Sequence, residues 1–317
     1  MSPGSSNKSP LSAGEKLAAK KPFLLLRSRI IRALRDFFLQ GGYMEVETPV
    51  LIPAPAPELH IDAIQAGHLF LHTSPELCMK RLLAAGYERI FQLCRCFREG
   101  ERGSGHLPEF TLLEWYRAGA DYRDLMDESE EMVLHLVKAL GFRETLRYQG
   151  KEIELSRPWL RLKVREAFPL YAGVTVEDVL AAGSFDETMV TRVEPHLGFP
   201  KPTFLYDYPS SLAALARTKA GEPETAERFE LYVAGVELAN AFSELTDAGE
   251  QKRRFEGERK GRQRLGKKPY PLPGKFLEAL PLMPESAGIA LGVDRLVMLF
   301  CDQAVIDRVV SFTPEEL

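Results

Sequence analysis

Two segments of the sequence read as β-hairpins, and they constrain the fold more than any other feature. In residues 89–117, RIFQLCRCFREGERGSGHLPEFTLLEWYR, two strand-like runs flank a glycine-rich loop. In residues 228–242, RFELYVAGVELANAF, two such runs flank a two-residue turn at Ala234-Gly235. Helical periodicity predicts helices around residues 30–38, 76–85 and 121–140. Hairpins separated by helices predict an α+β domain with an antiparallel sheet flanked by helices.

The remaining sequence predicts one domain behind a short tail. Residues 1–22 lack the apolar core of a signal peptide and are expected to form a flexible tail, with a single domain over residues 23–317. The formal net charge of −4 gives no sign of general nucleic-acid binding. No apolar run is long enough to span a membrane. Four cysteines without a paired framework favour a cytoplasmic protein.

The first hairpin places a carboxylate among residues that would normally form a core. Alternation puts Phe110, Leu112, Glu114 and Tyr116 on one face of the second strand, and Gln92, Cys94, Cys96 and Arg98 on one face of the first. A buried carboxylate requires a positively charged partner. Glu114 would pair either with Arg98 or with an ammonium group of a ligand, and the hairpin alone leaves both open. Cys94 and Cys96 would form half a metal site, but no second Cys/His pair at ligand spacing completes it, which favours ordinary strand cysteines.

The second hairpin brings two further carboxylates together. A two-residue turn places Tyr232 opposite Glu237 and makes Glu230 the diagonal neighbour of Glu237, at roughly 7–8 Å, where both could hold a divalent cation. The alternative is a solvated hairpin face. Ala239 and Ala241 are expected to continue the Glu237 face, whereas Glu244 reaches it only through a bulge or after the strand ends. Further on, a strand-to-helix junction at Gly292, followed by Arg295, favours an anion such as a phosphate.

Three stretches in this order resemble the three motifs of class II aminoacyl-tRNA synthetases: EVETPVL, FREGERGSGHLPEFTLLEWYR and GIALGVDRLVML. The resemblance runs from about residue 23 to the C-terminus and is strongest to lysyl-tRNA synthetase. That enzyme carries an N-terminal anticodon-binding domain, and this chain has only about twenty residues in its place. TSPELCMKRLLAAGYERIFQLCRCFR, EFTLLEWYR and GVELANAFSELTDA are more similar to the lysyl-tRNA synthetase paralogues that attach (R)-β-lysine to a lysine of elongation factor P.

The resemblance implies a role for each matched residue. ATP would be bound by Arg98, Glu99, Gly100, His106, Leu107, Phe110, Glu237, Leu238, Gly292 and Arg295, of which Arg98 and Arg295 would be catalytic. The lysine-like substrate would be bound by Ser74, Pro75, Glu76, Glu114, Tyr116, Glu244 and Ala290, and Mg²⁺ by Glu230 and Glu237. Ala290 stands where lysyl-tRNA synthetases have glycine, which would reshape the amino-acid pocket.

The sequence departs from the family pattern at two places. Leu107 replaces an asparagine, so an amide contact to ATP or substrate is lost. The family's Arg-x-Glu reads Arg98-Glu99-Gly100-Glu101 here, so the carboxylate that meets adenine would come from Glu101 or be replaced by backbone.

The function implied by the resemblance is an ATP-dependent ligase. It would activate (R)-β-lysine or lysine as an adenylate and transfer it to the ε-amine of a lysine of elongation factor P. The resemblance further implies a cytoplasmic homodimer that pairs through residues 24–48, without tRNA or a membrane as partner. Two alternatives remain: a truncated lysyl-tRNA synthetase that acts on tRNA, and a non-catalytic ligand-binding paralogue. The basic stretch 252–268 would contact a tRNA-like or acidic partner, or form a solvated helical arm.

Overall fold

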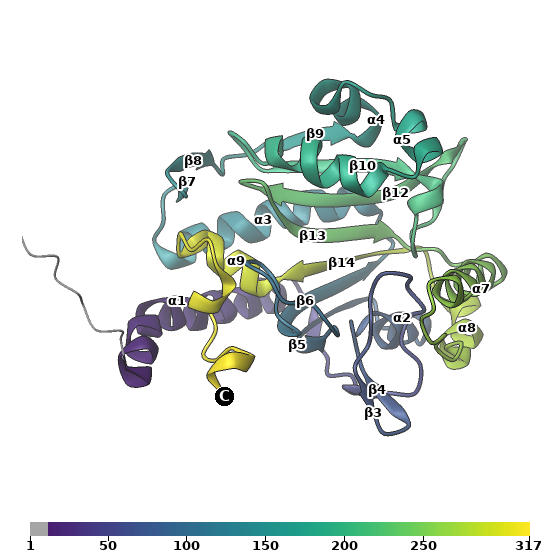
Figure 1. Cartoon of the computed structure of the whole chain (residues 1–317), viewed down its shortest axis with the longest axis horizontal. Helices are drawn as coiled ribbons and strands as arrows, with labels where there is room; N and C mark the ends of the chain where they lie inside the picture. The colour runs from purple at the N-terminus through teal and green to yellow at the C-terminus, as the bar shows by residue number, and fades with distance from the viewer. Residues whose placement is uncertain (1–11) are drawn as a thin grey trace, which may run out of the picture.

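A mixed nine-stranded sheet forms the centre of the computed structural model, which describes residues 12–317 (Figure 1). The strand order is β1-β5-β6-β14-β13-β12-β10-β9, and β11 pairs with β12. Their bounds are β1 (Met44–Glu45), β5 (Arg89–Phe97), β6 (Glu109–Ala118), β9 (Leu160–Lys163), β10 (Thr203–Pro209), β11 (Thr218–Lys219), β12 (Glu222–Val233), β13 (Val236–Ser243) and β14 (Ser286–Gly292). Only β1–β5 and β9–β10 pair in parallel, so the predicted α+β class is confirmed.

Helices cover both sides and one end of this sheet. Helices α1 (Ala13–Gln40) and α3 (Tyr122–Leu140) pack on each other, and α3 lies behind the central strands in Figure 1. Helix α9 (Val293–Phe300) continues directly from β14, while α2 (Glu76–Ala84), α7 (Ala248–Arg264) and α8 (Gly274–Ala279) gather at the right-hand end. The short helices α4 (Val164–Ala167), α5 (Val176–Ala182) and α6 (Phe185–Thr188) lie beyond β9 and β10. Two small sheets complete the fold: β2 (Leu51–Ile52), β4 (Leu69–Leu71) and β3 (Gln65–Ala66), and β7 (Thr145–Tyr148) with β8 (Lys151–Glu154).

The first helix starts earlier than the sequence indicated. Helix α1 begins at Ala13, so the expectation of a flexible tail is wrong for residues 13–22, and residues 1–11 lie outside the described residues. Ser12 and Glu15 form a reciprocal capping box that satisfies backbone N–H groups at the helix start. Lys20 is buried and pairs with Glu316 at 2.6 Å. This contact with the C-terminal residues stabilises the first turns of α1, whose own side chains are only weakly apolar.

Both predicted hairpins form, and the second contains a bulge. In the first, Gln92 pairs with Glu114 and Cys96 with Phe110, so the two polar faces coincide as expected. In the second, Tyr232 pairs with Glu237 as predicted, but Leu231 pairs with Ala239, which leaves Leu238 as an extra residue.

The bulge reverses the alternation along β13. Asn240 and Phe242 therefore share the Glu237 face, and Glu244 reaches it through the bulge, one of the two routes foreseen for it. The expectation that Ala239 and Ala241 continue the Glu237 face is wrong, because the register after the bulge puts both on the opposite face, although Ala239 still borders the cavity. None of the helices between residues 12 and 317 is long and apolar enough to cross a membrane.

Candidate active site

A cavity of about 330 Å³ opens over the middle of the sheet, lined by β6, β13, β14, the loop between β5 and β6, and the start of α2 and α9. All but four of the predicted site residues line it, namely Ser74, Glu76, Arg98, His106, Leu107, Phe110, Glu114, Tyr116, Glu237, Leu238, Glu244, Ala290, Gly292 and Arg295. The fold thus brings together residues from four separate parts of the sequence, namely 74–76, 98–116, 237–244 and 290–295.

The other four predicted residues do not line this cavity. Glu99 and Gly100 are exposed at the tip of the loop, where Gly100 adopts a positive φ of 78°. After this turn the chain returns, and Glu101 lies in the cavity wall with its carboxylate 3.6 Å from Arg98. Pro75 caps α2 instead of facing the cavity. The fourth residue is Glu230, on β12.

Glu114 sits at one end of the cavity without a cationic partner among residues 12–317. One carboxylate oxygen accepts a hydrogen bond from the Ser74 hydroxyl at 2.5 Å and the other from the Tyr116 hydroxyl at 2.8 Å. Glu114 is 1% exposed, and burial, followed by the charge of Glu76, raises the pKa of its carboxyl well above the usual range. Arg98 instead pairs with Glu101 and stacks over the Phe110 ring at 5.0 Å, so the pairing of Glu114 with Arg98 is wrong.

A buried lysine that was not among the predicted site residues pairs with two other carboxylates of the cavity. The Lys80 ammonium, 2% exposed, is 2.5 Å from an oxygen of Glu76 and 2.5 Å from an oxygen of Glu244. Burial lowers the pKa of Lys80, but the charges of Glu244 and Glu76 raise it by more, which keeps Lys80 protonated. The i,i+4 spacing of Glu76 and Lys80 on the predicted helix could have indicated this ion pair from the sequence.

This end of the cavity therefore has more carboxylates than cations. Glu76 and Glu244 share the ammonium of Lys80, and Glu114 pairs with no cation among residues 12–317. Burial and the charge of Glu76 raise the pKa of Glu244 to about 8 despite the neighbouring Lys80. The free carboxylate oxygen of Glu244 and the amide oxygen of Asn240 are buried and make no hydrogen bond with residues 12–317. A ligand carrying ammonium groups would satisfy these oxygens.

The opposite end of the cavity is cationic. Arg295, at the start of α9, donates to the Glu237 carbonyl oxygen at 2.7 Å and lies 2.5 Å from the His106 ring. Burial and the charge of Arg295 lower the pKa of His106, which makes its neutral form an acceptor. The buried Nε of Arg98 has no hydrogen-bond partner among the described residues. Two guanidinium groups, the N-terminus of α9 and the Phe110 ring suit a nucleotide with its phosphates.

Glu230 and Glu237 differ in their surroundings. Glu230 accepts hydrogen bonds from Arg228 at 2.5 Å, Tyr208 at 2.6 Å and Tyr232 at 2.7 Å. Glu237 lines the cavity, and burial, followed by the charge of Glu230, raises the pKa of its carboxyl. This repulsion fits a divalent cation at Glu237, with Glu230 as the nearby second carboxylate.

A glycine in β14 sets the shape of the amine end. Gly288, Ala290 and Gly292 share the cavity face of β14, and Ala290 pairs with both Glu114 and Asn240. A Cβ atom at Gly288 would lie 2.2 Å from the Tyr116 ring and 2.4 Å from a carboxylate oxygen of Glu244. Only glycine lets these two groups converge. The sequence analysis passed over Gly288, although its two-residue spacing from Ala290 marks the same strand face.

Comparison with known proteins agrees with this geometry. The family described as tRNA synthetases class II (D, K and N) matches residues 16–316. An elongation factor P--(R)-beta-lysine ligase of Enterobacter sp. (strain 638) is 40% identical over 316 residues, which cover 93% of this chain and 96% of that protein. Proteins of the same name from Salmonella arizonae and Salmonella heidelberg are 39% and 38% identical, with the same coverage.

The chain belongs to the elongation factor P--(R)-beta-lysine ligase family. Its sheet and helices are therefore a class II synthetase domain, and no anticodon-binding domain occurs among residues 12–317. Leu107 is 3% exposed, belongs to the main hydrophobic core and lines the cavity.

The raised pKa values predict that an ammonium ligand displaces protons from the site. At pH 7 a carboxyl with a pKa of about 8, as at Glu244, is mostly protonated, and a bound ammonium group favours its charged form. Lysine binding at pH 7 should therefore release protons, and affinity should rise with pH between about 6 and 9, until the ligand amine itself deprotonates near pH 10. Calorimetric titrations in two buffers of different ionisation enthalpy measure this release. Glu244→Gln should reduce it, and zero release by the unmodified protein would contradict the assignment.

Proposed function

We propose that this protein uses ATP to activate (R)-β-lysine or lysine and then transfers the aminoacyl group to a lysine ε-amine of elongation factor P. The observation that carries the proposal is Glu114, a buried carboxylate that pairs with no cation in the described part of the chain, in the same cavity as Arg98 and Arg295. The names of the relatives support the choice of amino acid and acceptor.

The two ends of the cavity would bind different groups of the substrates. Glu76, Glu114 and Glu244 would bind the amino groups, with Tyr116 and Ser74 orienting Glu114. Arg98 and Arg295 would neutralise the phosphates while the substrate carboxylate attacks the α-phosphate, which yields the adenylate and pyrophosphate. The acceptor amine then attacks the carbonyl carbon and AMP leaves. Such steps depend on positioning and charge neutralisation, so no catalytic base is assigned.

Glu237 and Glu230 would hold Mg²⁺, which when bound offsets phosphate charge. Glu237→Gln removes a cavity carboxylate, and we expect the Mg²⁺ concentration needed for half-maximal pyrophosphate exchange to rise. Glu230→Gln should act in the same direction but less strongly, because Glu230 already accepts three hydrogen bonds within the protein. Unchanged Mg²⁺ dependence in both variants would refute the metal assignment.

The proposed function is tested by mass spectrometry of elongation factor P. The purified acceptor is incubated with this protein, ATP and either (R)-β-lysine or lysine, and a parallel reaction contains tRNA for lysine instead. Modified elongation factor P supports the proposal. Charged tRNA with unmodified elongation factor P would show the truncated synthetase, and absence of pyrophosphate exchange with both amino acids would show a non-catalytic paralogue.

Ala290 is the residue we expect to bias the choice of amino acid. Its methyl group lies in the cavity wall between Glu114 and Asn240. One methyl group in a binding pocket changes discrimination by about 1–3 kcal/mol, or roughly ten- to two-hundred-fold. Ala290→Gly should therefore improve the use of lysine relative to (R)-β-lysine and leave the apparent affinity for ATP unchanged. Adenylation efficiencies for both amino acids measure this, and an unaltered ratio would remove Ala290 from the specificity determinants.

We also propose a cytoplasmic homodimer that pairs through α1 and β1. Leu25, Leu39 and Met44 on these elements are 59%, 54% and 55% exposed, and β1 is an edge strand of the sheet. Sedimentation at micromolar concentration should give twice the monomer mass. In α7, Arg254 and Arg262 bind to oxygen atoms of other elements. Lys252 and Arg253 pair with Glu256 and Glu250 of the same helix but keep exposed side chains, which would contact an acidic partner surface.

A further inference from the structure

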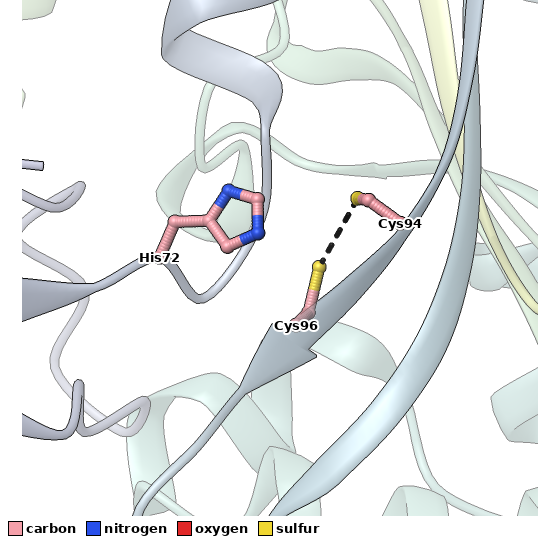
Figure 2. A group of neighbouring side chains, drawn as sticks. All are labelled: His72, Cys94 and Cys96. Atoms are coloured by element: carbon pink, nitrogen blue, oxygen red, sulfur yellow. Dashed lines mark hydrogen bonds between the residues drawn. The ribbon is translucent and has the colours of Figure 1, made fainter. Parts of the chain in front are cut away.

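One histidine and two cysteines, all common metal ligands, converge beside the active-site cavity. Figure 2 shows the His72 ring, which follows β4, facing the side chains of Cys94 and Cys96 on β5. The two sulfur atoms are 3.8 Å apart, and one ligand atom from each of the three residues lies within 4.8 Å of the others. His72 and Cys96 are buried, at 1% and 0% exposure. The sequence offered only Cys94 and Cys96, because nothing in it places His72 next to them.

The separation of the sulfur atoms matches a metal site. With zinc–sulfur bonds of about 2.3 Å in a tetrahedron, two thiolates lie roughly 3.8 Å apart, the separation found between Cys94 and Cys96. A disulfide fits less well, because it requires about 2.05 Å between sulfurs and Cα atoms within about 6.8 Å. Residues two apart on a strand have Cα atoms roughly 6.6–6.8 Å apart, at that limit, and pairing with Leu112 and Phe110 holds both cysteines in the strand.

The polar atoms of the cluster are also incompletely satisfied. His72 Nδ1 is buried and has no hydrogen-bond partner among residues 12–317, and Nε2 lies 2.7 Å from the Arg95 carbonyl oxygen. Thiolate and neutral imidazole are the forms that bind metal ions. These features supplement the geometry.

We propose that His72, Cys94 and Cys96 form a binding site for one thiophilic divalent ion of the zinc class, with a fourth position left for water or another small ligand. Sulfur and imidazole ligands select such ions over Mg²⁺, which prefers oxygen. The site connects two walls of the active-site cavity. Cys96 pairs with Phe110, and His72 is two residues before Ser74. A bound metal ion would therefore fix the position of the nucleotide side of the cavity relative to the amine side.

Cobalt(II) is the probe that tests the site. When metal-free, reduced full-length protein is titrated with Co²⁺, a sulfur-to-cobalt charge-transfer band should appear and reach its maximum at one Co²⁺ per chain. Added Zn²⁺ should abolish the band, and excess Mg²⁺ should leave it unchanged. Cys94→Ser and Cys96→Ser should lose most of this band, and His72→Gln should weaken and shift it. Cys78→Ser and Cys301→Ser are matched controls, since both thiols are free and partly buried, and they should keep the full band.

A second measurement covers variants that fold poorly. Zn²⁺ should raise the unfolding temperature of the unmodified protein and of both control variants, but not of the three site variants. Glu237→Gln should retain the cobalt band, which separates this site from the proposed Mg²⁺ site. Absence of the band in the unmodified protein, or its persistence in both Cys94→Ser and Cys96→Ser, would overturn the proposal.

Discussion

Arg295→Ala is expected to abolish pyrophosphate exchange, with a loss of roughly 10²–10³-fold or more, the scale seen when one charge-stabilising group is removed from an active site. Arg295 is the cavity guanidinium that fixes the phosphate end: it bonds to the Glu237 carbonyl oxygen and lies against His106. Its loss removes a positive charge and frees both of those groups. The measurement is amino-acid-dependent exchange at saturating ATP, alongside the unfolding temperature.

A matched control distinguishes catalysis from stability. Arg102 lies in the loop between β5 and β6, which also carries His106, and it pairs with Asp307 and Glu315 outside the cavity. Arg102→Ala makes the same substitution at an arginine outside the cavity, and we expect this variant to retain pyrophosphate exchange. If both variants lost activity together with a large fall in unfolding temperature, Arg295 would be a structural residue and the phosphate assignment would fail.

Gly288→Ala should inactivate the amine end of the cavity. The new methyl group would lie 2.2 Å from the Tyr116 ring and 2.4 Å from Glu244, so at least one of them must move. Overpacking of this kind costs about 1–3 kcal/mol of stability, and a displacement of about 1 Å at a reacting group lowers activity roughly 10²-fold. We expect the Michaelis constant for the amino acid to rise steeply and that for ATP to change little, because the phosphate end lies elsewhere in the cavity.

Gly257→Ala is the matched control for this substitution. Gly257 lies within α7, and a Cβ atom there meets nothing within 4 Å. Alanine should stabilise the helix by up to about 1 kcal/mol and leave both Michaelis constants unchanged. A Gly288→Ala protein with unaltered amino-acid kinetics would mean that Tyr116 and Glu244 do not define the amine pocket.

Local sequence patterns predicted the elements of the fold and much of the cavity. Period-two alternation in residues 89–117 placed Phe110, Glu114 and Tyr116 on one face, and the pairing of β5 with β6 confirms it. The Ala234-Gly235 turn set the register of Tyr232 against Glu237. These predictions succeeded because strand alternation and turn geometry depend on neighbouring residues only. The same locality explains an error: alternation alone has no means of locating the extra residue Leu238, and so it put Ala239 and Ala241 on the wrong face.

What the sequence determined by itself was the chemistry available: a carboxylate at Glu114 that needs a cation, guanidinium groups at Arg98 and Arg295, and the order of the three class II motifs. The tertiary structure decided which of these groups meet. It brought Lys80 between Glu76 and Glu244, and His72 onto Cys94 and Cys96. It also placed the side chains of Tyr116 and Glu244 in close contact with Gly288. Each of these contacts joins separate elements, and their packing follows from burial of the whole core rather than from any local pattern.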